Sequence, residues 1–419
     1  MPRYDRQPTG FDMNCGVKPA LLALAVTALM LPAAQAQEDE LPLFLTASQT
    51  FTRDSNLFKD DTRKESDSIS STAARFGLNK NYGRQQYRLD VTASHNKYSK
   101  NDQLDYNGLV SSAEFVTDLA SSFRLTADAA LSDLLPKFED NRNQEAQRRS
   151  NTQTIKRAGL DLRYGLYGRM SVNAGYSQSD VSYRVTKADN RDSNTWQVGL
   201  RYQPHDLLFY GLTYSQTNSD LPDRITPEEI KRRNLSLVAN WRVTGFSVLS
   251  SSLGYSRERY EVDPARDFNG VTGSAAWTFT PAGKVTYRVN WRRDTNNEGG
   301  RTFFSSGTSS LTSGANRVTN QLSASATWQA TSKISSTATL THVRYEEESN
   351  FTSVSKGIER TDSQDTRGRL NAVSLGVDYQ PMRSLAVGCD LQHYDRTQSA
   401  FSQAYSGRTV SCSLGFTLD

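Results

Sequence analysis

Hydrophobic and polar residues alternate one by one along most of the chain, and the segment KVTYRVNWRRDT at residues 284–295 shows the pattern clearly. Val285, Tyr287 and Trp291 occupy one parity, and polar or basic residues occupy the other. Because successive side chains of a strand point to opposite faces of a sheet, the segment is predicted to be a strand with one apolar and one polar face.

The same alternation recurs from one end of the chain to the other. It is clear in YRLDVTAS (87–94), FRLTADAAL (123–131), WQVGLRY (196–202), LSLVANW (235–241), VTGSAAWTF (271–279), LSASATW (322–328), VSLGVDY (373–379) and CSLGFTL (412–418). Short connections alternate strictly with longer polar ones, which include residues 54–66, 135–149, 218–229, 296–314 and 348–364. Counting the segments predicts 18 strands, mostly of about 12–16 residues.

Strands of this length are too long for a soluble sandwich, where the average is about 5–6 residues, but they suit a membrane crossing. Backbone groups that face lipid must all be paired, so the sheet must close. An even strand count with short turns on one side is typical of outer-membrane barrels. The predicted fold is therefore all-β: an 18-stranded antiparallel transmembrane β-barrel of the outer membrane, with both mature termini on the periplasmic side.

Aromatic residues on the apolar parity support this orientation. They lie a few residues before the short connections, where amphipathic rings form the girdle at a membrane interface. The residues expected in the periplasmic girdle are Tyr164, Tyr202, Trp241, Trp277, Phe279, Trp328 and Tyr379.

The first 36 residues have the features of a signal peptide. The apolar run at 19–34 follows Lys18 and precedes small residues that end at Ala36, after which we place the cleavage. A membrane anchor is the alternative, but Pro32 interrupts a run already shorter than the roughly 20 residues needed to span a bilayer. Residues 37–419 are then one barrel domain. Translation could begin at Met1 or Met13.

Composition excludes several classes of protein. Of the 419 residues 36% are hydrophobic, and the mean hydropathy is −0.64, which fits long polar loops and a polar interior. The formal net charge of +4 is too balanced to suggest a nucleic-acid partner. Three cysteines exclude a disulfide scaffold, and Cys15 lies in the leader. Cys389 and Cys412 lie on the last two strands, and they stand opposite one another if the hairpin between them closes around Ala400 and Phe401. Lipid-facing free thiols are the preferred interpretation, and a disulfide is the alternative.

No catalytic or metal-binding constellation emerges from the titratable residues. His205 lies in a short connection, and His95, His342 and His393 take the outward parity. None of them faces the interior beside a serine or a carboxylate, so neither a hydrolytic triad nor a metal cluster is expected. We predict a protein that is not an enzyme and that has no cofactor.

The inward parity is rich in small and hydroxylated residues, and its charges are unevenly distributed. A basic side is expected to carry Arg157, Arg163, Arg201, Arg242, Lys284, Arg288 and Arg292, with Asp161 and Glu258 as its acids. An acidic side is expected to carry Asp90, Glu114, Asp118, Asp128, Asp378 and Asp390, offset by Arg88 and Arg124. Two such sides would create a transverse field, and the basic side would guide an anionic polymer through multiple weak contacts. Scattered ion pairs are the simpler interpretation.

Two segments carry a family resemblance. TRDSNLF (52–58) and YGRQQYRLD (82–90) resemble EpsL-type outer-membrane proteins, a family encoded in exopolysaccharide operons and part of a wider group of β-barrel porins. The likeness is strongest over 44–100 and continues more weakly through 149–166 and 194–204. It implies a role in exopolysaccharide assembly or export and no catalytic residues. One departure is the chain end: barrels commonly finish with an aromatic residue, whereas Phe416 here is followed by Thr-Leu-Asp.

The leading hypothesis from sequence is thus a monomeric, passive, water-filled conduit for a polysaccharide. A general porin for small solutes is one alternative. A docking protein that anchors surface polysaccharide through its loops is another. The expected partners are outer-membrane lipid, the exopolysaccharide and the outer-membrane assembly machinery, with periplasmic export components as a further candidate.

Overall fold

The computed structural model describes residues 43–120, 122–136, 138, 148–262, 264–281, 283–295, 302–306, 309–355, 358–398 and 403–418. The predicted signal peptide, residues 1–36, lies outside these ranges. Nearly all of the described chain is strand, with three short 3-10 helices at η1 (Asp102–Leu104), η2 (Lys187–Asp189) and η3 (Pro264–Arg266). Within these ranges, no helix is long and apolar enough to cross a membrane.

The strands follow one another along the chain as antiparallel neighbours. The first nine are β1 (Leu43–Asp54), β2 (Asp67–Tyr82), β3 (Gln85–Tyr98), β4 (Tyr106–Leu119), β5 (Phe123–Leu134), β6 (Gln153–Tyr164), β7 (Met170–Tyr183), β8 (Arg191–His205) and β9 (Leu208–Leu221). The remainder are β10 (Glu228–Thr244), β11 (Ser247–Tyr260), β12 (Phe268–Phe279), β13 (Val285–Thr295), β14 (Thr302–Ser306), β15 (Ser309–Gln329), β16 (Ile334–Ser355), β17 (Ile358–Met382), β18 (Leu385–Arg396) and β19 (Tyr405–Leu418).

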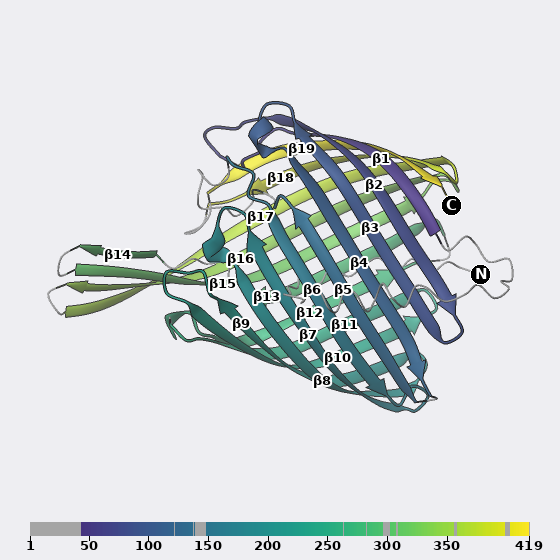
Figure 1. The fold of residues 1–419 in the computed structure, drawn as a ribbon, viewed down its shortest axis with the longest axis horizontal. Helices are drawn as coiled ribbons and strands as arrows, with labels where there is room; N and C mark the ends of the chain where they lie inside the picture. The colour runs from purple at the N-terminus through teal and green to yellow at the C-terminus, as the bar shows by residue number, and fades with distance from the viewer. Residues whose placement is uncertain are drawn as a thin grey trace.

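The sheet closes on itself. β1 pairs with β2 on one side and with β19 on the other, so that Leu45 stands opposite both Phe76 and Leu418. β14 pairs with β15 alone, while β13 also pairs with β15 directly. Leaving β14 out, the described chain forms a closed antiparallel barrel of 18 strands (Figure 1). The predicted fold class is confirmed.

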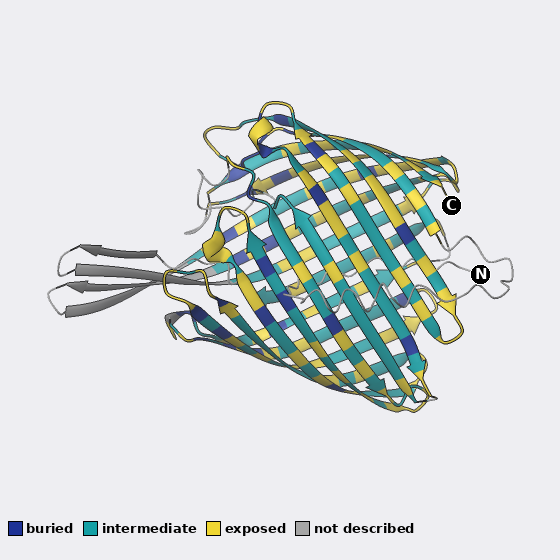
Figure 2. Cartoon of the chain, viewed as in Figure 1, coloured by how far each residue is buried: buried dark blue, intermediate teal, exposed yellow. Residues whose placement is uncertain are grey.

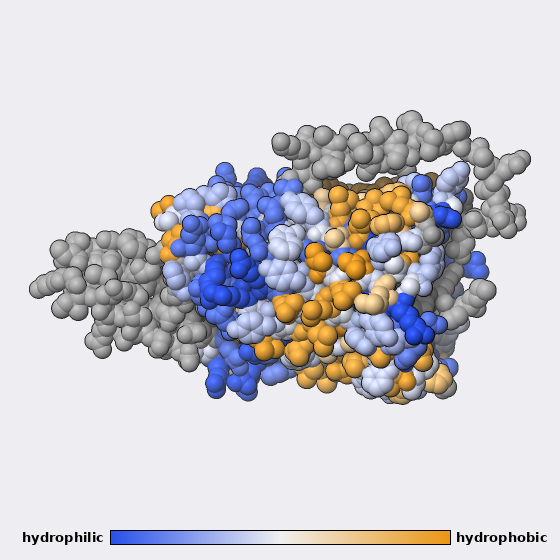
Figure 3. All heavy atoms as spheres, turned by 90° about the horizontal axis from the view of Figure 1, so that it is seen from below, coloured by the Kyte–Doolittle hydropathy of each residue, from blue (hydrophilic) through white to orange (hydrophobic). Residues whose placement is uncertain are grey.

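Exposure follows the predicted alternation on the barrel wall. Side chains such as Leu253 on β11 and Leu375 on β17 are about half exposed, whereas their chain neighbours are more covered. Figure 2 shows exposed and less exposed positions alternating along many of the strands. On the face seen in Figure 3, the apolar residues gather in a belt, with a broad hydrophilic band beyond it on the side of the longer loops. A closed barrel with such a belt is the architecture of outer-membrane proteins, because the belt suits lipid and no backbone edge is left unpaired.

The aromatic residues expected in the girdle lie on the outward face near the short turns. Tyr164, Trp241, Trp328 and Tyr379 are exposed. Several of the girdle rings also contact another aromatic ring on the same or an adjacent strand. The ring centroids lie 4.8 Å apart for Phe123 and Tyr164, 5.4 Å for Tyr202 and Tyr210, and 5.6 Å for Trp277 and Phe279.

The eight short connections all lie at one end of the barrel, together with the start of β1 and the end of β19 (Figure 1). The turn between β2 and β3 shows why two residues suffice there. Gly83 adopts φ +58, a left-handed conformation that glycine reaches without steric cost. We take this end as periplasmic, following the short-turn rule for outer-membrane barrels.

Two segments expected as loops are largely strand. Within 348–364, β16 runs to Ser355 and β17 begins at Ile358, and residues 309–314 belong to β15. With β14 these strands extend past the rim as a projecting sheet (Figure 1). The alternation of apolar and polar residues disappears beyond the membrane, because both faces of such a ribbon meet water. The sequence pattern therefore predicts loops where polar strands continue. The loop predicted at 218–229 is also shorter than expected, because β9 runs to Leu221 and β10 begins at Glu228.

Cys389 and Cys412 stand directly opposite each other on β18 and β19, as their spacing predicted. The structure records them as a disulfide with a Cα–Cα distance of 4.1 Å, which corresponds to the alternative rather than the preferred interpretation from sequence. Their outward parity, shared with Leu391 and Val410, places the pair on the lipid face, away from the lumen.

Candidate functional site in the barrel lumen

Residues of the polar parity line the interior. Thr278 on β12, Arg288 on β13 and Ser325 on β15 stand side by side in register, as expected from the sequence. Hydroxyl groups of neighbouring strands pair across the wall, for example Thr195 Oγ1 with Thr217 Oγ1 at 2.8 Å. Barrels of 16–18 strands are wide enough to hold an aqueous channel, and small hydroxylated linings leave that space open. The lumen is therefore built for water and polar solutes.

The acidic residues predicted on β3, β4 and β5 each have an arginine partner. The four ion pairs are Arg75–Asp90 at 2.5 Å, Arg88–Glu114 at 2.6 Å, Arg124–Asp118 at 2.7 Å and Arg157–Asp128 at 3.7 Å. Sequence reasoning missed Arg75, although its parity opposite the outward Phe76 already marks it as inward. Part of the predicted acidic side is thus a ladder of compensated pairs, each of which contributes about 0–1 kcal/mol in contact with water.

Two lumenal arginines lack a carboxylate partner among the described residues. Arg163 lies near the periplasmic end of β6, and Arg201 lies at a similar height on β8. The Arg201 guanidinium lies 3.6 Å from the centroid of the Phe209 ring and donates a hydrogen bond to Gln203 Oε1 at 3.0 Å. Asp161, the acid predicted beside them, accepts instead from Asn173 Nδ2 at 3.2 Å.

Two lumenal carboxylates lack an arginine partner in the same described part of the chain. Asp390 on β18 stands opposite Gly376, and Asp378 on β17 stands opposite Gly388. A Cβ atom at Gly376 would come within 2.5 Å of Asp390 Oδ1, and one at Gly388 within 2.8 Å of Asp378 Oδ1. The glycines therefore make room for the acids. About half of the barrel circumference separates them from Arg163 and Arg201, so a transverse charge difference remains between these two walls.

The rest of the predicted basic side is partly compensated towards the extracellular mouth. Arg232 contacts Glu258 at 3.3 Å and Asp294 at 2.6 Å, and Arg292 contacts Asp294 at 2.8 Å. Arg232 and Asp294 were missed from the sequence because they lie at strand ends. Glu258 is 1% exposed. This network reduces the basic surplus that the sequence predicted on β10–β13.

Of the two other residues predicted on the basic side, Arg242 lies on the wall as predicted and Lys284 does not. Arg242 on β10 stands opposite Val248 on the inward parity. Lys284 lies in the turn before β13, and its Nζ donates to the Ala330 carbonyl at 2.9 Å, so it belongs to the periplasmic rim rather than to the wall.

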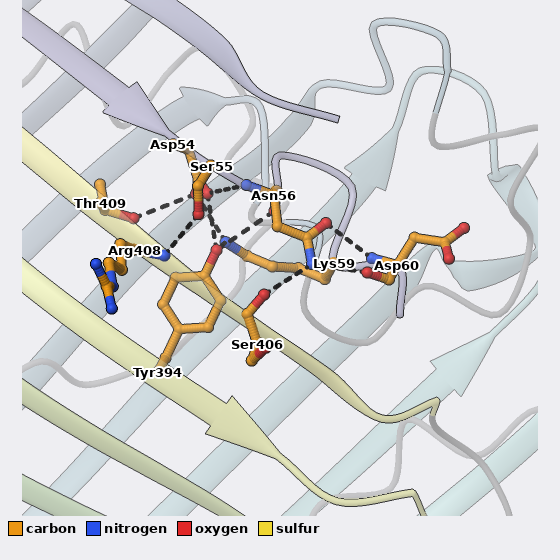
Figure 4. Close-up of polar contacts among 9 residues, drawn as sticks. All are labelled: Asp54, Ser55, Asn56, Lys59, Asp60, Tyr394, Ser406, Arg408 and Thr409. Atoms are coloured by element: carbon orange, nitrogen blue, oxygen red, sulfur yellow. Dashed lines mark hydrogen bonds and ion pairs between the residues drawn. The ribbon is translucent and has the colours of Figure 1, made fainter. Parts of the chain in front are cut away.

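The loop after β1, residues 55–66, is anchored to the last two strands around Asp54 (Figure 4). Asp54 accepts hydrogen bonds from the Asn56 backbone N–H at 2.8 Å, Lys59 Nζ at 2.7 Å and Tyr394 OH at 2.7 Å. Thr409 Oγ1 adds a longer one at 3.3 Å. Lys59 also lies 3.9 Å from the Tyr394 ring centroid. This contact set ties the first loop to β18 and β19 across the barrel closure.

Asn56 is the centre of the loop itself, and no part of it is exposed. Its Nδ2 donates to the carbonyls of Asp60 at 2.7 Å and Ser406 at 3.0 Å. The backbone N–H groups of Arg63 and Thr62 donate to Asp60, and they lower the pKa of that carboxyl below its ordinary value. The segment TRDSNLF, singled out by its resemblance, therefore forms the anchor of this loop.

The apolar end of the same segment packs inside the barrel mouth. Leu57 and Phe58 form a buried cluster with Leu104 of η1, against Ile69 and Tyr98. Ile69 and Tyr98 stand opposite each other on the inward parity of β2 and β3. Loop 55–66 consequently covers part of the inner wall at the extracellular mouth and reduces the cross-section there.

The histidines occupy the places expected from their parity. His95 and His342 are exposed, and each ring pairs through Nδ1 with an asparagine at 2.7 Å, Asn107 and Asn371 respectively. His205 closes β8 at a short turn. The described ranges contain no group of three or more His, Cys, Asp or Glu residues that could hold a metal ion. The absence of enzyme activity stays a prediction.

Comparisons with known proteins complete this description. No protein-family profile matches the chain, and no curated protein sequence matches it. The resemblance to EpsL-type proteins therefore receives no support from either comparison.

Several solved outer-membrane proteins are similar in structure. OpdK from Pseudomonas aeruginosa is 14% identical, with 90% of this chain and 99% of that chain covered and a TM-score of 0.48. OccK2 (OpdF) from Pseudomonas aeruginosa, solved in complex with glucuronate, is 13% identical, with 90% and 96% covered and a TM-score of 0.49. OccAB3 from Acinetobacter baumannii is 10% identical, with 90% and 98% covered and a TM-score of 0.47. These likenesses carry no argument about function, so the class of this protein rests on its own barrel and lumen.

Proposed function

We propose that this protein is a passive, water-filled channel for small polar solutes across the outer membrane. The observation that supports the proposal is the lumen: an 18-stranded wall lined by small hydroxylated residues and by charges that are mostly paired. Such a lining binds no solute tightly, so solutes can enter and leave. The proposal needs no partner beyond outer-membrane lipid and the assembly machinery, and it treats the barrel as a monomer.

The unpaired charges give the channel a modest discrimination between ions. Arg163 and Arg201 on one wall face Asp378 and Asp390 on the other across a space with low-dielectric walls, which focus the field into the lumen. Because most other charges form pairs, the selectivity is weak, and an anion passes along the arginine wall without being trapped there.

The exopolysaccharide conduit remains the rival function, and it rests on the resemblance of residues 52–58 and 82–90. Loop 55–66 weighs against it, because a loop anchored inside the mouth narrows the path that a hydrated polymer would have to pass. An anchoring role for the projecting sheet of β14–β17 would need no open lumen at all.

Swelling of proteoliposomes separates these three functions. We expect liposomes that contain the purified barrel to swell in isosmotic pentose and hexose, and to swell progressively more slowly as the sugar grows from mono- to trisaccharide. Dextran of polymer size should not enter, since the mouth is constricted. Entry of dextran would favour the polymer conduit instead, and no swelling in any sugar would favour the anchoring protein. Liposomes without protein supply the baseline.

A further inference from the structure

Four basic side chains form a cluster on the outside of the barrel, on β10 and β11. In register, Lys231 stands directly opposite Arg259, and Arg233 directly opposite Arg257. We call these four residues the basic quartet. They share the outward parity of the exposed Leu235 on β10 and Tyr255 on β11, so the quartet belongs to the outer surface and not to the lumen.

Like charges directly opposite on neighbouring strands destabilise a sheet unless an anion compensates them. Lys231 has Glu229 at 3.0 Å, and Arg259 has Asp267 at 3.1 Å. The second rung differs. Arg233 Nε donates to the neutral Gln216 Oε1 at 3.2 Å, and Arg257 has no carboxylate partner in the described part of the chain. Both arginines are exposed. The Arg233–Arg257 rung therefore exposes two guanidinium groups whose charge no carboxylate of the described chain compensates.

The position of the rung along the strands places it at the membrane surface. The next rung towards the periplasm pairs Leu235 with Tyr255, and both side chains are exposed in the apolar belt. Trp241, in the periplasmic girdle, lies eight residues from Arg233, or about 26 Å of strand at about 3.3 Å per residue. Strands tilted by about 40° convert this to about 20 Å along the membrane normal, close to the height of an apolar belt.

The hydrophilic band beside the belt in Figure 3 lies at the end of the barrel that carries the longer loops. The rung lies towards that end of β10 and β11, so it faces the outer leaflet of the outer membrane. That leaflet consists largely of glycolipid whose sugar head carries phosphate groups. Guanidinium groups bind phosphate through paired, charge-assisted hydrogen bonds.

We propose that the Arg233–Arg257 rung binds a phosphate group of an anionic glycolipid in the outer leaflet, with the acyl chains lying over Leu235 and Tyr255. The contiguity of the rung with the apolar belt favours a lipid over free phosphate, because one molecule then satisfies both the cations and the apolar surface. The Arg233–Arg257 rung thus acts as a lipid anchor that fixes the height and rotation of the barrel in its membrane.

Another set of outward arginines at a comparable height shows what the site requires. Arg344 stands opposite Arg369, but Glu346 contacts Arg344 at 3.5 Å and Arg293 at 3.6 Å. A carboxylate of the chain already serves those cations, and Asn320 accepts a further hydrogen bond from Arg293 at 2.9 Å. The Arg233–Arg257 rung has no such internal anion, which is why we place the lipid there.

Native mass spectrometry of the full barrel in neutral detergent tests the proposal. Diphosphorylated lipid A is titrated onto the wild type, onto Arg233→Gln/Arg257→Gln and onto the matched control Lys97→Gln/Lys156→Gln, which removes two outward basic residues from β3 and β6. We expect the arginine variant to bind the lipid about 30-fold more weakly, because each lost cation weakens binding about five- to sixfold. The control should stay within about twofold of wild type.

Two further measurements test the proposal even if the glutamine variant does not fold. Lipid A stripped of its phosphates should bind the wild type about 30-fold more weakly than the diphosphorylated form, and Arg233→Lys/Arg257→Lys should keep most of the affinity because the charge remains. The proposal is wrong if the stripped lipid binds equally well or if the glutamine variant binds like wild type. Displacement of the lipid by inorganic phosphate at millimolar concentration would also overturn it, since the rung would then be a site for free anions.

Discussion

Replacing Arg163 and Arg201 together by glutamate is expected to make the channel select cations. These two side chains are lumenal cations without a carboxylate partner in the described ranges, and the exchange turns their wall negative while Asp378 and Asp390 stay negative opposite. Low-dielectric walls focus that change into the lumen. We expect the permeability ratio of potassium to chloride to rise by roughly 3- to 10-fold, measured as the reversal potential in a salt gradient across a planar bilayer.

The matched control acts on the opposite wall. Asp378→Asn with Asp390→Asn should shift the reversal potential in the other direction, towards anions, because glycines rather than charged groups stand opposite both acids. Neutralising Arg242, Arg288 and Arg292 together should reduce anion preference less than the exchange at β6 and β8, since Arg292 shares Asp294. An unchanged reversal potential in every one of these variants would mean that the charges line the lumen without selecting ions.

Removing the carboxylate of Asp54 is expected to release loop 55–66 from the mouth. In Asp54→Ala, the Lys59 ammonium, whose side chain is 11% exposed, loses its counter-ion, and Tyr394 OH loses its acceptor at 2.7 Å. Breaking a buried pair by deleting one partner costs about 3 kcal/mol or more. That cost shifts the balance between closed and open loop by about 100-fold. The single-channel conductance should therefore rise, and proteases added from the loop side should cut the loop.

Asp61→Ala is the control for this variant, because Asp61 lies in the same loop and is exposed. It removes the same charge from the mouth and should leave both conductance and protease resistance unchanged. Equal behaviour of the two variants would show that the charge of the loop, and not its anchoring through Asp54, controls the mouth.

The wall of the barrel was predictable from the sequence because its cause is local. The parity of Val289 and Trp291 against Arg288 and Arg292 already says which side chains meet lipid, and the register later follows from the short turns. Ion pairing was not predictable in the same way. Arg75 and Asp90 are diagonal neighbours on β2 and β3, and whether two long side chains meet depends on register and reach.

The mouth was beyond sequence reasoning for a different reason. Asp54 accepts a hydrogen bond from Tyr394, which lies 340 residues away in the chain, and no periodic pattern in the sequence predicts such a contact. Its segment was noticed only through a resemblance that the comparisons do not support, although the likeness marked residues that do build a specific loop anchor. The extension of β16 and β17 past the membrane escaped prediction because a ribbon in water has no apolar face.

Single-channel recording of the purified barrel in a planar bilayer tests the central claim most directly. A water-filled lumen predicts discrete and long-lived current steps in potassium chloride, with a nearly linear current–voltage relation at low voltage and weak ion selectivity. Folding of the same sample is checked by its heat-sensitive migration on a denaturing gel. A correctly folded barrel that inserts into the bilayer and carries no current above that of the lipid alone would contradict the account.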